Sequence, residues 1–110
     1  MTKNEYKIKI NSLNFKIIEV DEIEKTDDGR QTIGYTDYIN QKILLLRTLS
    51  FEQKINTLRH ELTHAFLWAY GLGAMYEELP LEIVCDFVGI YSGEIVEIAN
   101  KYMKEVLDND

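Results

Sequence analysis

Residues 50–71 read SFEQKINTLRHELTHAFLWAYG, a stretch with a helix start signal, a helical apolar period and a stop signal. Ser50 followed three residues later by Gln53 is a Ser-x-x-Gln capping box. Gly71 is the type of residue that commonly ends a helix. We therefore predict a helix over about residues 51–70.

The apolar residues of this helix recur on one side of a helical wheel, as they do when a helix packs on a sheet. The apolar set consists of Phe51, Ile55, Leu58, Leu62, Ala65, Phe66 and Ala69. His60 and His64 lie on the opposite side together with Thr57. We expect the apolar side to face the protein core.

The same helix contains His60-Glu61-Leu62-Thr63-His64, the His-Glu-x-x-His pattern of zinc-dependent hydrolases. Residues four apart in a helix are separated by about 6 Å along the axis and about 40° around it, so both imidazoles can reach one ion. Glu61 is turned by about 100° from His60 and lies beside such an ion, where it can deprotonate a water molecule. The alternative is that both histidines are polar residues on the solvent side of an ordinary helix.

The composition limits how a metal site can be completed. The chain has 110 residues, of which 45% are hydrophobic and 28% charged, as expected for a single folded, soluble domain over residues 1–110. Its one cysteine, Cys85, excludes an intramolecular disulfide and every multi-thiolate zinc site. Because His60 and His64 are its two histidines, further ligands must be carboxylates.

The charge balance argues against polyanionic partners. Nineteen acidic residues against 12 Lys plus Arg give a net charge of −7, which disfavours binding to nucleic acid or to an anionic membrane surface. No stretch approaches the ~20 apolar residues of a membrane span, and the polar start over residues 1–5 lacks the apolar core of a secretory signal. We expect a cytoplasmic protein.

The first half of the chain is rich in strand signals. Residues 6–10 alternate between apolar and polar side chains, and residues 15–20 form a second β-rich run. Residues 32–38 and 42–47 are predicted to form a hairpin. The expected fold is therefore α+β, with a small N-terminal antiparallel or mixed sheet of three to four strands packed against about three helices.

The remaining two of these helices are expected after residue 80. Pro80 suits a first helical turn, and residues 80–91 are apolar almost all round, which is typical of a buried helix. Ser92-Gly93 is expected to break or bend this helix. Residues 94–107 then form a last, more amphipathic helix.

Glu82 and Asp86 share one narrow stripe of the helix predicted over residues 80–91. A buried carboxylate is costly unless it is paired or binds a metal. Glu82 is therefore our candidate for the third metal ligand, and Asp86 for the acceptor that orients a ligand histidine. A solvated polar stripe or a salt bridge to Lys or Arg is the alternative. Glu77 and Glu78 are weaker ligand candidates.

These residues resemble the Glu-zincin metallopeptidases, in which a downstream Glu-x-x-x-Asp completes the site; here it runs from Glu82 to Asp86, 18 residues after His64. The likeness is greatest to the ImmA/IrrE family, small intracellular metallopeptidases common in bacterial mobile elements and prophages. It covers about residues 33–91, although Thr63 stands where the family has Gly. The resemblance implies a zinc endopeptidase that cleaves a protein partner, often a transcriptional repressor.

The expected function is a zinc-dependent metalloendopeptidase with Zn²⁺ bound by His60, His64 and Glu82 and with an open fourth position. Glu61 would take a proton from water and pass it to the leaving amine. A Tyr, an Arg or the metal alone would stabilise the oxyanion. The tyrosine candidates are Tyr35, Tyr38, Tyr70 and Tyr76.

The strand predicted over residues 42–47 has two possible roles. At a sheet edge it could pair with an extended peptide substrate beside the metal. Its run Ile43-Leu44-Leu45-Leu46 is equally typical of a buried strand.

A function of another class is a non-catalytic protein-interaction module in which the metal is a structural staple, since a core of this size is marginal. Glu61 separates the two functions, because a structural site has no use for a carboxylate beside an open position. Its presence favours the enzyme.

Overall fold

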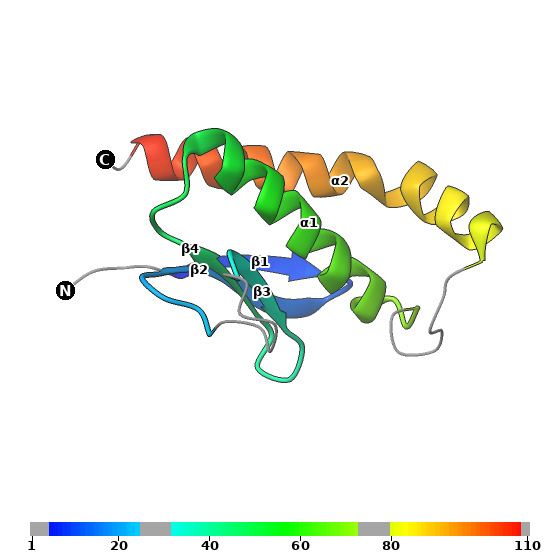
Figure 1. The fold of residues 1–110 in the computed structure, drawn as a ribbon. Helices are drawn as coiled ribbons and strands as arrows, with labels where there is room; N and C mark the ends of the chain where they lie inside the picture. Colours follow the sequence, from blue (N-terminus) through cyan, green and yellow to red (C-terminus); the bar gives the residue numbers. More distant parts are fainter. Residues whose placement is uncertain (1–4, 25–31, 73–79, 109–110) are drawn as a thin grey trace.

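The computed structural model describes residues 5–24, 32–72 and 80–108. Over these residues the fold is α+β, with a four-stranded mixed sheet and two helices that lie on one face of the sheet (Figure 1). The elements are β1 (Glu5–Ile10), β2 (Leu13–Val20), β3 (Gly34–Asp37), β4 (Lys42–Leu46), α1 (Phe51–Ala69) and α2 (Leu81–Asp108).

The sheet has the strand order β1-β2-β4-β3. β1 and β2 form an antiparallel hairpin whose turn residues, Asn11 and Ser12, have positive φ angles of 50° and 68°. β4 pairs parallel with β2 and antiparallel with β3. β1 and β3 are therefore the edges of this sheet, and β4 lies inside it.

The interior position of β4 decides between the two roles considered for residues 42–47. Ile43 and Leu45 are completely buried, and both neighbouring positions of the strand are occupied. The edge-strand interpretation is wrong for these residues, and the buried-strand interpretation is confirmed. The edge strand of the hairpin is β3.

The predicted hairpin between β3 and β4 is confirmed. The Asp37 carboxylate accepts hydrogen bonds from the Asn40 side-chain amide at 3.0 Å and from the Asn40 backbone N–H at 3.1 Å. These bonds lower the pKa of Asp37. The Leu46 N–H also donates to the Ile33 carbonyl at 3.0 Å, so the short edge strand is held along its length.

Helix α1 begins and ends as predicted. The Gln53 N–H donates to Ser50 Oγ at 3.2 Å and the Ser50 N–H donates to Gln53 Oε1 at 3.1 Å, which completes the capping box. Gly71 follows the helix with a φ of +81°, in the left-handed region that suits glycine.

The apolar side of α1 packs on the sheet as predicted, except at Phe51, which is 50% exposed in the first turn. Four side chains of α1 are fully buried in the same core as five from the sheet. They are Leu58, Leu62, Ala65 and Phe66 from α1, and Ile10, Phe15, Ile17, Ile43 and Leu45 from the strands.

Helix α2 is continuous over 28 residues, so the described part of the chain has two helices and not about three. The expected break at Ser92-Gly93 is wrong. A glycine inside a helix costs only about 1 kcal/mol relative to alanine. Buried side chains on both sides of the pair, Phe87 before it and Ile95 after it, hold the two parts on the same core.

The first part of α2 is also less buried than its sequence predicts. Val88 is 51% exposed and Ile90 is 67% exposed. The reason is that α2 packs on the core along one side, and among the described residues no element covers its outer side. No helix in the described ranges has both the length and the apolar character needed to cross a membrane.

The later part of α2 is anchored by a polar cluster as well as by apolar contacts. The Glu19 carboxylate of β2 accepts hydrogen bonds from Lys54 Nζ of α1 at 3.0 Å and from the Tyr102 hydroxyl of α2. The Lys54 and Glu19 side chains are 11% and 13% exposed. The Glu19 carboxylate thus links β2, α1 and α2 at a largely buried position.

Candidate metal centre and active site

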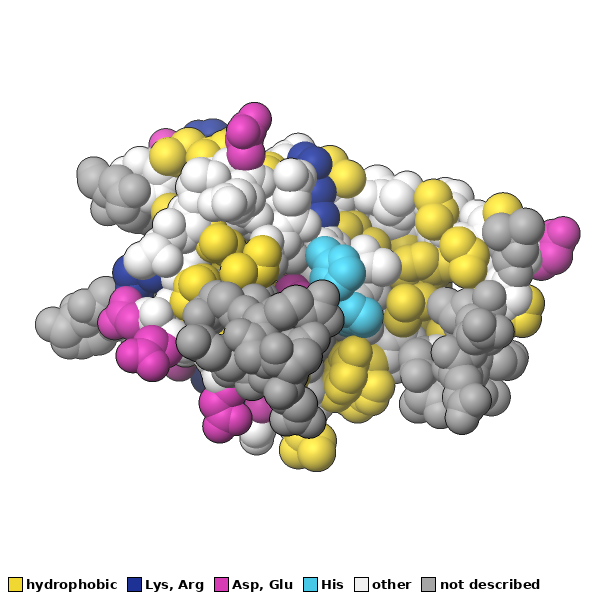
Figure 2. Space-filling view, viewed as in Figure 1, with side chains coloured by type: hydrophobic (Ala, Val, Ile, Leu, Met, Phe, Trp, Pro, Cys, Tyr) yellow, Lys and Arg dark blue, Asp and Glu magenta, His cyan; other side chains and the backbone are white. Residues whose placement is uncertain are grey.

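The structure brings His60 and His64 together on the exposed side of α1. Their ring centroids are 4.9 Å apart with an interplanar angle of 76°. Figure 2 shows the two imidazoles side by side at the surface. This arrangement follows from the four-residue spacing on a regular helix, and it leaves both rings accessible to one ion.

Glu61 points away from this surface and is 8% exposed. The hydroxyl of Thr36, on β3, donates a hydrogen bond to Glu61 Oε1 at 2.7 Å. The same hydroxyl lies 3.1 Å from the backbone oxygen of Glu61. The carboxylate between the two histidines in sequence is therefore held against the edge strand.

Gly34 allows β3 to lie this close to α1. A Cβ atom at Gly34 would come within 2.5 Å of Thr57 Cγ2 and 3.3 Å of Glu61 Oε2. Gly34 and Thr36 are two positions apart on a strand, so they face the same side. Sequence reasoning missed both residues, although a glycine inside a predicted strand is a known sign of close backbone approach.

Tyr38 is a tyrosine candidate whose ring contacts α1 near the His-Glu-x-x-His motif. Its ring stacks on Trp68 at 5.7 Å, and Trp68 is on α1 one turn after His64. Burial raises the pKa of Tyr38, and the negative charge of Glu61 raises it further. Tyr38 is therefore within electrostatic range of Glu61.

The other tyrosine candidates lie elsewhere. Tyr70 packs between Phe66 and Tyr91, and burial followed by the nearby Tyr91 raises its pKa. Tyr35 is 51% exposed on the edge strand. Tyr76 lies outside the described residues.

Glu82 and Asp86 are both exposed on α2, which corrects the expectation that they are buried. Their exposure agrees with the alternative of a solvated polar stripe. Among the described residues, no three His, Cys, Asp or Glu side chains are grouped closely enough to hold a metal ion. Glu82 is thus not beside the two histidines in this structure. Glu77 and Glu78 lie outside the described residues.

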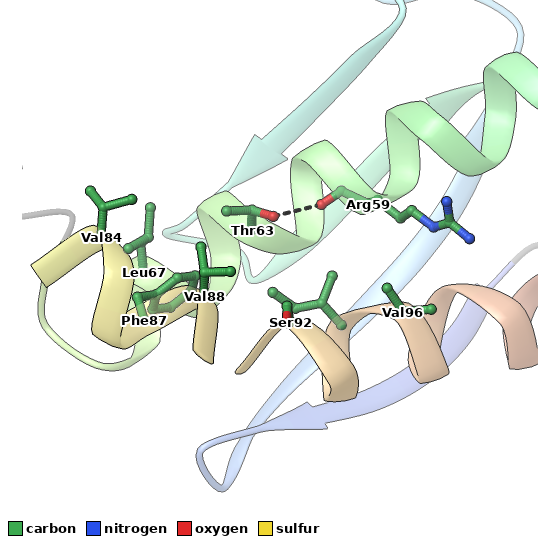
Figure 3. A pocket seen from close by; sticks show the side chains of 9 residues that line it. Arg59, Thr63, Leu67, Val84, Phe87, Val88, Ser92 and Val96 are labelled. Carbon is green, nitrogen blue, oxygen red and sulfur yellow. Dashed lines mark hydrogen bonds between the residues drawn. The ribbon is translucent and has the colours of Figure 1, made fainter. Parts of the chain in front are cut away.

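An apolar groove of about 440 Å³ lies between α1 and α2 (Figure 3). It is lined by side chains that include Thr63 and Leu67 of α1 and Val84, Phe87, Val88 and Ser92 of α2. Thr63 directly precedes His64, so this groove borders the histidine face.

The residues present fit a metal ion in part. Two adjacent imidazoles on one accessible face, with a carboxylate next to one of them in the sequence, are the donor and base types of a catalytic zinc site. Among the described residues, no third ligand accompanies the two histidines.

Comparison with known proteins adds no neighbour: no family model, no curated protein and no solved structure matches the chain. The motif and the geometry around it are therefore the basis for any functional conclusion.

Proposed function

We propose that this protein is a zinc-dependent metalloendopeptidase similar to the ImmA/IrrE family, which hydrolyses a peptide bond in a protein partner such as a transcriptional repressor. The observation that carries the proposal is the position of Glu61. It lies between the two histidines in the sequence of α1, and its buried carboxylate is held by Thr36 of the edge strand, while the two imidazoles are exposed next to each other. A purely structural metal site has no need for this carboxylate.

His60 and His64 would hold the ion, with Glu82 as the third ligand. Zinc bound there would act as a Lewis acid and lower the pKa of a water molecule toward about 7. Glu61 accepts the proton of the attacking water and transfers it to the leaving amine. Tyr38 is our candidate for hydrogen bonding to the carbonyl oxygen of the substrate.

The roles of Glu82 and Asp86 rest on their chemistry and spacing. A carboxylate is the natural third donor for a two-histidine zinc site. Because Glu82 is apart from the histidines in this structure, the first turns of α2 have to approach α1 for it to bind the same ion. Asp86, one helical turn later, would then accept a hydrogen bond from a ligand histidine.

The edge strand β3 is the proposed binding surface for an extended substrate. β3 pairs with β4 on one side only, and Tyr35 on it is 51% exposed. A peptide that adds to this edge through backbone hydrogen bonds would run beside Glu61 and the histidines. This replaces residues 42–47, which are interior, as the peptide-binding strand.

The test compares zinc binding and proteolysis in matched variants. We expect one zinc ion per wild-type chain by calorimetry, weak binding in His64→Ala, and weaker binding in Glu82→Gln. Glu61→Gln is expected to retain zinc and to lose about 10²–10⁴-fold in cleavage of a fluorogenic peptide library, the usual contribution of a general base. Glu52→Gln, an exposed change of the same kind in the first turn of α1, is the control. Equal cleavage by wild type and Glu61→Gln contradicts the proposal.

A non-catalytic interaction module with a structural metal is the second candidate. The separation of Glu82 from the histidines counts against the enzyme, because among the described residues the two imidazoles have no third ligand. This candidate predicts that zinc raises the unfolding temperature while wild type and Glu61→Gln behave identically with the protein partner.

A further inference from the structure

We propose that Thr36 is a positioning residue for catalysis, which holds the Glu61 carboxylate in one orientation against the edge strand β3. This inference rests on the proposed metallopeptidase function. It assigns a role to a residue of the edge strand that lies outside the His-Glu-x-x-His motif.

The contact is short and buried. Thr36 is 6% exposed and Glu61 is 8% exposed. The Thr36 hydroxyl donates to Oε1 at 2.7 Å and lies 3.1 Å from the backbone oxygen of the same residue. Because Thr36 touches both the head and the backbone of Glu61, it restricts rotation of the side chain between them.

The bond occupies Oε1 and orients Oε2. A Cβ built on Gly34 would lie 3.3 Å from Oε2, so that oxygen lies against β3 at Gly34. Only a residue without a side chain at position 34 leaves this space open. Oε1 is thus the anchored oxygen, and we assign the proton transfer to Oε2.

The anchor is itself rigid. Thr36 lies in a hairpin closed by the two Asp37–Asn40 hydrogen bonds and paired along β4. A glutamate side chain has three rotatable bonds, and freezing them costs conformational entropy. When the protein has already restricted these bonds, the base needs no reorganisation at the moment of reaction.

A simple structural role for Thr36 makes different predictions from a positioning role. If the hydroxyl only satisfied a buried carboxylate, its removal would lower stability and leave turnover unchanged once the protein is folded. Thr63 offers a matched control, because its hydroxyl bonds to the Arg59 carbonyl of its own helix at 2.8 Å and not to Glu61.

The experiment measures turnover, zinc binding and the Glu61 side chain in Thr36→Val, Thr36→Ser and Thr63→Val. We expect Thr36→Val to lose about 10–100-fold in kcat, with KM and the zinc Kd within about twofold of wild type, as for a misplaced catalytic group. Thr36→Ser is expected to restore kcat to within about threefold, because it retains the donor, and Thr63→Val to match wild type.

A second measurement can be made without zinc or substrate. The zinc-free protein is labelled with ¹³C-glutamate, and the NMR scalar couplings of the Glu61 side chain are measured. We expect them to show one rotamer in wild type and in Thr36→Ser. In Thr36→Val we expect values averaged over several rotamers. If Thr36→Val is too unstable to study, Thr36→Ala gives the same comparison. The inference is overturned if Thr36→Val turns over like wild type while Glu61→Gln is inactive, or if Glu61 keeps one rotamer without the hydroxyl. Full activity of Glu61→Gln would instead contradict the proposed metallopeptidase function. The rotamer measurement would still show whether Thr36 holds Glu61.

Discussion

Alanine substitution should have opposite effects at two glycines of this protein. At Gly34 the added methyl group would lie 2.5 Å from Thr57 Cγ2 and 3.2 Å from Glu61 Cγ, so the helix or the strand must shift. Inserting a methyl group into a packed interface costs about 1–3 kcal/mol, and the reduced freedom of the unfolded chain returns about 0.4–1 kcal/mol. We expect Gly34→Ala to lower the free energy of unfolding by about 1–2 kcal/mol.

Gly89 has a different environment. It lies within α2, and apart from its chain neighbours and the nearby backbone of the same helix, no atom comes within 4 Å of a Cβ placed on it. Alanine is favoured over glycine inside a helix by about 1 kcal/mol. Gly89→Ala should therefore raise the free energy of unfolding by about 0.5–1 kcal/mol.

The assay is urea unfolding of the zinc-free protein, followed by circular dichroism and by fluorescence of Trp68. The denaturant slope should not change between variants, so midpoints report stability directly. Thr57→Ser removes the methyl group that the new Cβ of Gly34→Ala would meet. The double variant should therefore regain at least about 0.5 kcal/mol of unfolding free energy compared with the sum of the two single changes. If Gly34→Ala is as stable as Gly89→Ala, β3 does not pack on α1 as described.

Three further changes test the helices. Ser50→Ala should cost about 0.5–2 kcal/mol of unfolding free energy because it removes the cap on Gln53, and an unchanged urea midpoint would argue against the capping box. Leu62→Ala should cost about 2–5 kcal/mol, since this side chain is fully buried, and a smaller loss by calorimetry would place it outside the core. Tyr102→Phe should cost about 1.5–3 kcal/mol by loss of the bond to Glu19. Burial and Glu19 raise the pKa of Tyr102 above its ordinary value of 10.0, so the wild type should lose stability as pH rises above that value; urea unfolding at about pH 8 and about pH 11 should show a smaller loss in the variant.

The features that depend on near neighbours in the chain could be predicted from the sequence. The capping box at Ser50, the left-handed stop at Gly71 and the β3–β4 hairpin involve residues a few positions apart. The pairing of His60 with His64 is of the same kind, because the helix itself sets the distance between residues four apart.

The extent of α2 and its burial could not be predicted in this way. Ser92-Gly93 is a plausible break by local propensity, yet Phe87 and Ile95 on either side pack on one core and keep the helix continuous. Likewise an apolar periodicity shows that a side chain favours burial, but not whether another element is present to cover it. Ile90, at 67% exposure, has no such cover among the described residues.

The sequence by itself therefore determined the motif helix, its boundaries and the common face of its two histidines, because local hydrogen bonds and helical geometry specify all three. Only the tertiary structure decided that β3 is the edge strand, that Thr36 holds Glu61 across 25 positions of the chain, and that Glu82 lies apart from the histidines. These depend on which elements pack together, and the free energy of that packing is summed over side chains distant in sequence, which no local pattern contains.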